Sequence, residues 1–105
     1  MSQVYLSYED FVQKVGEMPQ VSREELDALI ANEAPDDVLF DALLPWIAST
    51  LKNAGARYQS LELLYRTLSK TRNIIARRDY RNAADLTHTI DWAIRQETIG
   101  YLCGS

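Results

Sequence analysis

The sequence predicts an all-α protein, a small bundle of four to five helices that ends in a long antiparallel helical hairpin. Only four glycines and three prolines interrupt the 105 residues. No alternation of apolar and polar residues typical of strands persists, and several segments begin with helix-start signals. A chain of this length forms one domain, so we expect residues 1–105 to fold as a single helical unit.

The first two helices are predicted from their capping residues. Ser7 followed by Asp10 resembles a capping box, in which each side chain satisfies a free backbone N–H at the helix start. It predicts a first helix that runs to about Glu17. Ser22 with Glu25 is a complete capping box, and it predicts a second helix that runs to about residue 32.

The third helix is predicted to be central, because its apolar side chains point in nearly all directions. It begins near Pro35, where Asp36 and Asp37 favour the positive end of the helix dipole. Pro45 lies inside this segment and has no N–H to donate, which predicts a kink or a break. Gly55 then favours a helix end.

The last two helices are predicted to form the hairpin. The fourth spans about residues 57–77, a polar elbow covers 77–82, and the fifth runs to about Ile99. Apolar periodicity assigns each helix a core stripe. On the fourth helix the stripe contains Leu61, Leu64, Leu68, Thr71 and Ile75, and on the fifth it contains Ala83, Leu86, Ile90, Ala93, Ile94 and Tyr101.

Charge divides the chain into two unlike parts. Residues 1–45 carry ten carboxylates against Lys14 and Arg23, whereas residues 46–105 carry nine cations against five carboxylates. Such asymmetry favours either an internal electrostatic match or a charged partner. It does not choose between the two.

The residues that usually carry catalysis are few. His88 is the single histidine and Cys103 the single cysteine. No phosphate-binding loop, CxxC or HExxH motif is present, so we expect no enzyme, no cofactor and no catalytic residues. Asp85 and His88 lie one helical turn apart, which leaves a small enzyme or metal binder centred on His88 as an alternative, although one histidine is too few for a di-iron bundle.

Localisation is predicted from what the composition lacks. A single cysteine allows no internal disulfide, and no signal peptide or membrane-spanning stretch is recognised. We therefore expect a cytoplasmic protein.

The basic segment 52–81 suggests a second alternative, a nucleic-acid-binding regulator. Its cations are interleaved with tyrosines, which could contact phosphates and stack on bases. However, the whole chain is acidic, with a pI near 4.9, and nucleic-acid-binding domains are usually basic. We therefore do not expect nucleic acid to be the partner.

The fifth helix has a second apolar face. Trp92 and Ile99 lie nearly opposite its core stripe, beside His88 and Arg95. Either another helix of the chain or a partner must cover this tryptophan. Leu63 and Ile74 also lie off the main stripe of the fourth helix, which favours a second contact face.

The leading hypothesis is a non-enzymatic protein–protein interaction module, such as an adaptor, a small chaperone or an inhibitor of the immunity type. The partner would be another protein, with acidic character to match the arginines, or a second copy of the chain as a homodimer. The predicted partner-binding residues are Trp92, Ile99, Arg95, His88, Arg66, Lys70, Arg77, Arg78 and Arg81.

Overall fold

The computed structural model describes residues 4–55 and 59–103, with the backbone alone for residues 101–103. In these residues the chain forms helices and connecting segments and contains no strand. The helices are α1 (Tyr8–Gly16), α2 (Arg23–Ala31), α3 (Asp36–Ala54), α4 (Leu61–Arg77) and α5 (Ala83–Cys103). The all-α prediction is therefore confirmed.

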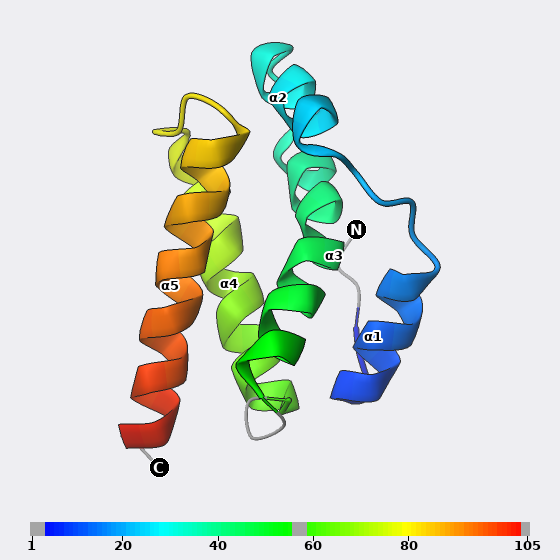
Figure 1. The fold of residues 1–105 in the computed structure, drawn as a ribbon, viewed down its shortest axis with the longest axis vertical. Coiled ribbons are helices and arrows are strands. Elements are labelled where there is room, and N and C mark those ends of the chain that lie inside the picture. The colour runs from blue at the N-terminus through cyan, green and yellow to red at the C-terminus, as the bar shows by residue number, and fades with distance from the viewer. Residues whose placement is uncertain (1–3, 56–58, 104–105) are drawn as a thin grey trace.

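The helices form a bundle around α3 (Figure 1). α3 packs against α1, α2 and α4, and α5 packs against α4 and α2. The most extensive packing joins α4 to α5, which form the predicted C-terminal hairpin. In the view of Figure 1, α5 lies at the left edge of the molecule, and no other helix lies beyond it on that side.

Two helices begin where their capping residues predict. Ser7 Oγ accepts a hydrogen bond from the Asp10 backbone N–H at 3.1 Å, and Ser22 Oγ accepts one from the Glu25 N–H at 3.1 Å. The Asp10 carboxylate accepts from the N–H of Leu6 at 3.0 Å rather than from that of Ser7. Both α1 and α2 end within about a residue of their predicted ends.

α3 is continuous through Pro45, so the predicted break is absent. A proline inside a helix costs about 3 kcal/mol, because the carbonyl one turn earlier loses its N–H donor. Leu43, Leu44 and Ile47, on both sides of the proline, are essentially inaccessible to solvent. Their burial supplies the packing energy that offsets the lost hydrogen bond. Gly55 ends the helix with a φ of 121°, a conformation that side chains with a Cβ rarely adopt.

The hairpin helices differ from their predicted bounds at one end each. α4 begins at Leu61 rather than near residue 57, because Ser60 Oγ accepts a hydrogen bond from the Leu63 N–H at 3.2 Å. Residues 56–58 of the predicted range lie outside the described residues. α5 continues past Ile99 to Cys103.

The core combines the predicted stripes of α4 and α5 with buried side chains of α1, α2 and α3. Leu64, Leu86 and Ile90 are fully buried. Thr71 is also buried and donates its hydroxyl hydrogen to the Thr67 carbonyl at 2.9 Å, which satisfies that polar group inside the core. Tyr101, predicted as a core residue, has a side chain outside the described part.

Leu63 and Ile74 correct one prediction. They were expected to form a second contact face, but they are 0% and 8% exposed, respectively. α4 packs against both α3 and α5, so it buries a wider arc than a single stripe. These two residues belong to the core.

None of the described helices is both long enough and apolar enough to cross a membrane.

Candidate functional site: the outer stripe of α5

Four of the predicted partner-binding residues lie along one line on the surface of α5. His88, Trp92, Arg95 and Ile99 are separated by steps of four, three and four residues, which return to the same side of an α-helix. All four are exposed. The opposite side of the helix is buried against the bundle, so these residues form an outer stripe of α5.

The outer stripe exposes two large apolar side chains. The side chains of Trp92 and Ile99 are 61% and 56% exposed. No described helix covers Trp92, so the sequence-based alternative in which the chain itself covers this tryptophan does not hold for the described residues. Removing a large apolar side chain from water stabilises a fold or a complex. Trp92 and Ile99 gain little of this stabilisation in the single chain, because more than half of each side chain remains in water.

Arg95 is the charged member of the outer stripe. Its Nε lies 3.3 Å from Asp91 Oδ2, one turn earlier on the same helix. This ion pair gives Arg95 a counter-charge on its own helix. The outer stripe is therefore largely apolar and aromatic, with one cation that already has a counter-charge.

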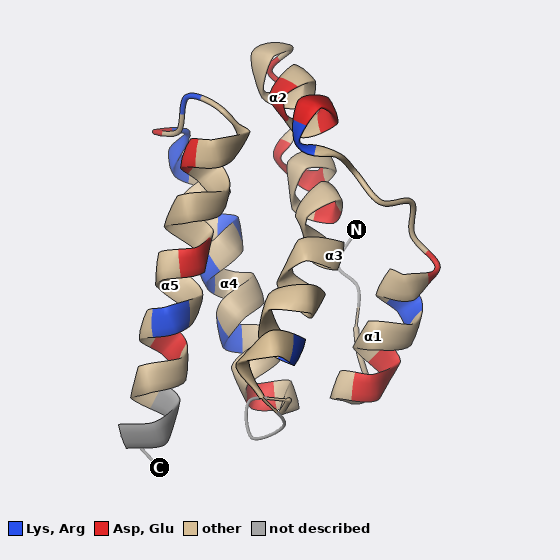
Figure 2. Ribbon diagram, viewed as in Figure 1, with Lys and Arg blue, Asp and Glu red and all other residues tan. Residues whose placement is uncertain are grey.

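The remaining predicted residues belong to the basic ridge, which we define as the cations of α4 and of the elbow after it. Figure 2 shows basic positions along α4 and in the elbow. Most of these cations form ion pairs with carboxylates of the described chain. Two of the pairs, Arg72 with Asp37 at 3.9 Å and Arg78 with Asp36 at 2.5 Å, join the basic part of the sequence to the acidic part. The other pairs on this ridge are Arg66 with Glu62 at 3.1 Å and Lys70 with Glu97 at 3.8 Å.

Arg77 and Arg81 are the members of the basic ridge that form no ion pair with any described residue. Both are exposed. They lie at the elbow end of the hairpin, so the cations of the ridge that have no ion-pair partner among the described residues are gathered there.

Arg78 has a structural role in the elbow. It occupies the left-handed backbone region at φ 52° and ends α4. Its guanidinium donates to the Ala34 carbonyl at 3.2 Å as well as to Asp36, and so ties the elbow to the start of α3. The Tyr80 hydroxyl donates to the Ile75 carbonyl at 3.2 Å, and burial raises the pKa of this hydroxyl above its usual value. The elbow is thus held in place by contacts with the start of α3 and with the last turn of α4.

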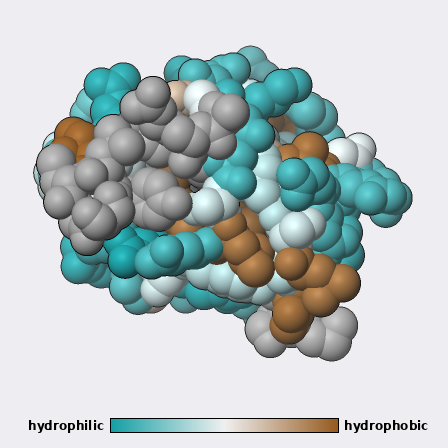
Figure 3. Space-filling view, turned by 90° about the horizontal axis from the view of Figure 1, so that it is seen from below, coloured by the Kyte–Doolittle hydropathy of each residue, from teal (hydrophilic) through white to brown (hydrophobic). Residues whose placement is uncertain are grey.

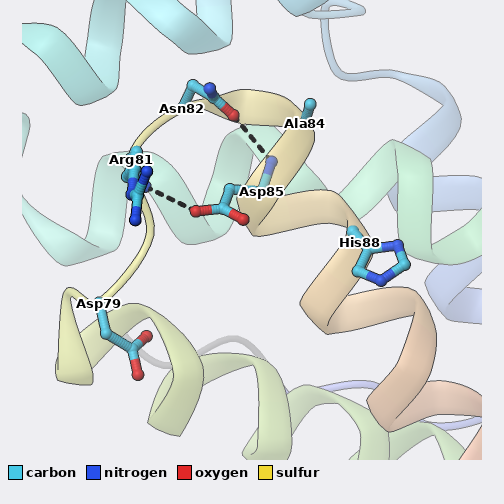
Figure 4. Close-up of a pocket in the computed structure, with 6 residues that line it drawn as sticks. All are labelled: Asp79, Arg81, Asn82, Ala84, Asp85 and His88. Carbon is cyan, nitrogen blue, oxygen red and sulfur yellow. Dashed lines mark hydrogen bonds between the residues drawn. The ribbon is translucent and has the colours of Figure 1, made fainter.

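Asp85 and His88 line an open depression of about 660 Å³ at the elbow (Figure 4). Asp85 is occupied with capping α5: its carboxylate accepts from the Arg81 N–H at 3.1 Å, and its own N–H donates to Asn82 Oδ1 at 2.8 Å. Figure 4 shows the Asp85 carboxylate turned toward the elbow, whereas the His88 imidazole points away from it. Among the described residues, no group of three or more His, Cys, Asp or Glu side chains could hold a metal ion.

Asp27 makes a contact that sequence reasoning missed. Its carboxylate accepts a hydrogen bond from the Ala83 backbone N–H at 2.6 Å, so a residue of α2 caps the first turn of α5. The two residues are 56 positions apart. Capping signals are recognised from neighbours in sequence, and nothing local to Ala83 indicates this partner.

A second region of apolar surface lies in the segment that precedes α1. Val4 and Leu6 are 68% and 84% exposed on either side of the buried Tyr5. The Tyr65 hydroxyl accepts from the Tyr5 N–H at 3.0 Å and donates to the Tyr5 carbonyl at 3.2 Å, which holds this segment against α4. Seen from below, hydrophobic surface extends from the middle of the molecule toward one edge (Figure 3).

Compared with models of known families, with curated proteins and with solved structures, the chain shows no significant match to any of them.

Proposed function

We propose that this chain is a non-enzymatic protein–protein interaction module that binds its partner through the outer stripe of α5. An adaptor, a small chaperone and an inhibitor of the immunity type are the roles that fit such a module. The observation that carries the proposal is the 61% exposure of Trp92 on the side of α5 opposite the buried Ala83, Ile90 and Ile94.

A partner would stabilise this surface for a simple physical reason. Tryptophan, tyrosine and arginine dominate the binding energy of protein interfaces, because they combine a large contact area with few rotatable bonds or with several donors. Trp92 and Arg95 bring two of these residue types to the same helix face. Ile99, 56% exposed, extends the apolar contact by two further turns.

The ion pairs of the basic ridge support a protein partner over nucleic acid. A polyanion binds when cations are free to replace its counter-ions. Arg66, Lys70 and Arg78 each lie within 4 Å of a carboxylate of the same chain. Arg77 and Arg81 form no such pair with any described residue, so they are the cations that would orient an acidic group on a partner protein. This role fits the acidic partner that the sequence predicts.

A crosslinking experiment in cells that produce the protein tests the proposal. Gln96 is exposed beside the outer stripe, whereas Glu24 is exposed on α2, away from it. A photo-crosslinking residue at position 96 should capture a partner protein, which can be a further copy of this chain. The same residue at position 24 should capture little. Adding Trp92→Ala should abolish the crosslink from position 96. Equal capture from both positions, or capture that survives Trp92→Ala, would overturn the proposal.

A further inference from the structure

We infer that the partner on the outer stripe of α5 is a second copy of this chain, docked as an antiparallel helix. This inference rests on the proposed function, because it names the occupant of the same surface. It depends on the spacing of the stripe, on its order of residue types and on the place of α5 in the bundle.

The spacing of the outer stripe matches a helical partner. Asp85 precedes the stripe by three residues on the same side, so exposed positions recur at 85, 88, 92, 95 and 99. Alternating steps of three and four form the contact line of a coiled coil, in which one helix packs lengthwise along another. A partner helix would therefore stay in contact with the stripe over several turns.

α5 is accessible along its length. Its 21 residues span about 30 Å. Its neighbours in the bundle are α4 and α2, which contact its inner side, and α5 lies at the edge of the molecule (Figure 1). A second copy can approach the outer stripe without displacing any described helix.

The order of residue types makes the outer stripe complementary to itself in the antiparallel direction. With the two-fold axis between positions 93 and 94, Trp92 faces Arg95 of the second copy, and Ile99 faces His88 of the second copy. Each contact occurs twice, as two-fold symmetry requires. A guanidinium over an indole ring is a favourable cation–π pair, and this register encloses both exposed apolar side chains.

Charge favours the antiparallel over the parallel direction. In a parallel pair Arg95 would face Arg95 and His88 would face His88, so like groups would meet across the interface. In the antiparallel pair each Arg95 faces an aromatic ring and retains its own Asp91 at 3.3 Å. The second copy therefore adds no unbalanced charge to the contact.

Analytical ultracentrifugation of the purified full chain over a range of concentrations tests the inference. The wild type should show a monomer–dimer equilibrium, and Trp92→Ala should raise the dissociation constant at least about tenfold. Ile99→Ala should weaken it in the same direction. Val38→Ala is the matched control, since Val38 is 42% exposed on α3, and it should leave the equilibrium unchanged. Circular dichroism of every variant should show unchanged helix content.

Disulfide formation tests the direction of the helices. In a Cys103→Ser background, one batch of chains carries His88→Cys and another carries Ile99→Cys. When the two batches are mixed and oxidised, an antiparallel pair gives the mixed dimer, whereas a parallel pair gives dimers of like chains. Dimers of like chains would overturn the inference.

The outcomes separate this inference from the proposed function. A chain that stays monomeric at the highest soluble concentration, while position 96 captures another protein in cells, would end the inference and leave the proposed function standing. A dimer that is indifferent to both Trp92→Ala and Ile99→Ala would also end the inference, because the interface would then lie elsewhere. A monomer with no capture from position 96 would end both proposals.

Discussion

The two helices of the C-terminal hairpin expose outer faces of opposite character. α4 carries a row of cations, and most of these have a carboxylate of the same chain within 4 Å. α5 carries fewer charges, and its largest apolar side chains, Trp92 and Ile99, stay in water. The charged groups on the outer face of α4 therefore find most of their partners within the chain. The apolar groups on the outer face of α5 do not. This uncovered apolar surface is the reason why the proposed interface is placed on α5 rather than on α4.

The inner faces of the hairpin should show the largest effects. Leu64 on α4 and Ile90 on α5 are both 0% exposed. Leu64→Ala and Ile90→Ala should each lower the free energy of unfolding by about 2–4 kcal/mol, because the substitution loses buried area and leaves a cavity. Urea denaturation measures this change. A loss below about 0.5 kcal/mol at either position would show that the helix buries a different face.

The Tyr65 hydroxyl is the next largest contribution on the hairpin. Tyr65→Phe removes the hydrogen bonds to both the N–H and the carbonyl of Tyr5, and it should cost about 1 kcal/mol of unfolding free energy. Tyr80→Phe is a matched control that removes a single hydrogen bond to a helix-end carbonyl and should cost less. If thermal unfolding shows that both variants lose the same free energy of unfolding, then the two hydrogen bonds to Tyr5 stabilise the protein no more than the single bond of Tyr80.

The ion pair between Arg78 and Asp36 should contribute less still. Both side chains are nearly half exposed, at 45% and 49%, and such pairs are worth about 0–1 kcal/mol. A double-mutant cycle with Arg78→Gln and Asp36→Asn measures the coupling, which should shrink in high salt. A coupling that is both large and insensitive to salt would mean that the basic ridge is a structural element rather than a surface.

The outer stripe of α5 should show the smallest effect on the stability of the monomer. At concentrations too low for association, Trp92→Ala should change the free energy of unfolding by no more than about 0.5 kcal/mol, because surface substitutions rarely do more. Chemical denaturation monitored by circular dichroism gives the value. A loss of several kcal/mol would place Trp92 in the core and remove the contrast between the two outer faces.

The sequence predicted the fold well where the signals are local. The caps at Ser7 and Ser22 and the core stripes of α4 and α5 depend on residues within a few positions of one another. The structure confirms both caps, and it buries the described members of the stripes, with Leu61 only partly buried. The start of α4 was misplaced because Ser60 caps that helix without the acidic residue that completes a capping box.

The surface was predicted less completely because it depends on contacts between distant segments. The sequence indicated the exposed Trp92 and Ile99, since their position opposite a core stripe is a property of one helix. It did not indicate that Leu63 and Ile74 would be covered, which depends on α4 packing against two neighbours. The internal use of Arg72 and Arg78 depends on residues of α3 that are more than 30 positions away.

The hydrogen bond from the Ala83 N–H to Asp27 links the completion of α5 to the docking of α2. Until α2 is in place, the first turn of the last helix lacks one of its caps, although Asn82 and Asp85 already supply theirs. The exchange of the Ala83 amide hydrogen with solvent deuterium therefore reports on the separation of α2 from the hairpin. Amides in the middle of α5 report on the opening of the hairpin itself. The difference between the exchange rate at Ala83 and the exchange rates at these amides measures how independently the acidic and basic parts of this chain unfold.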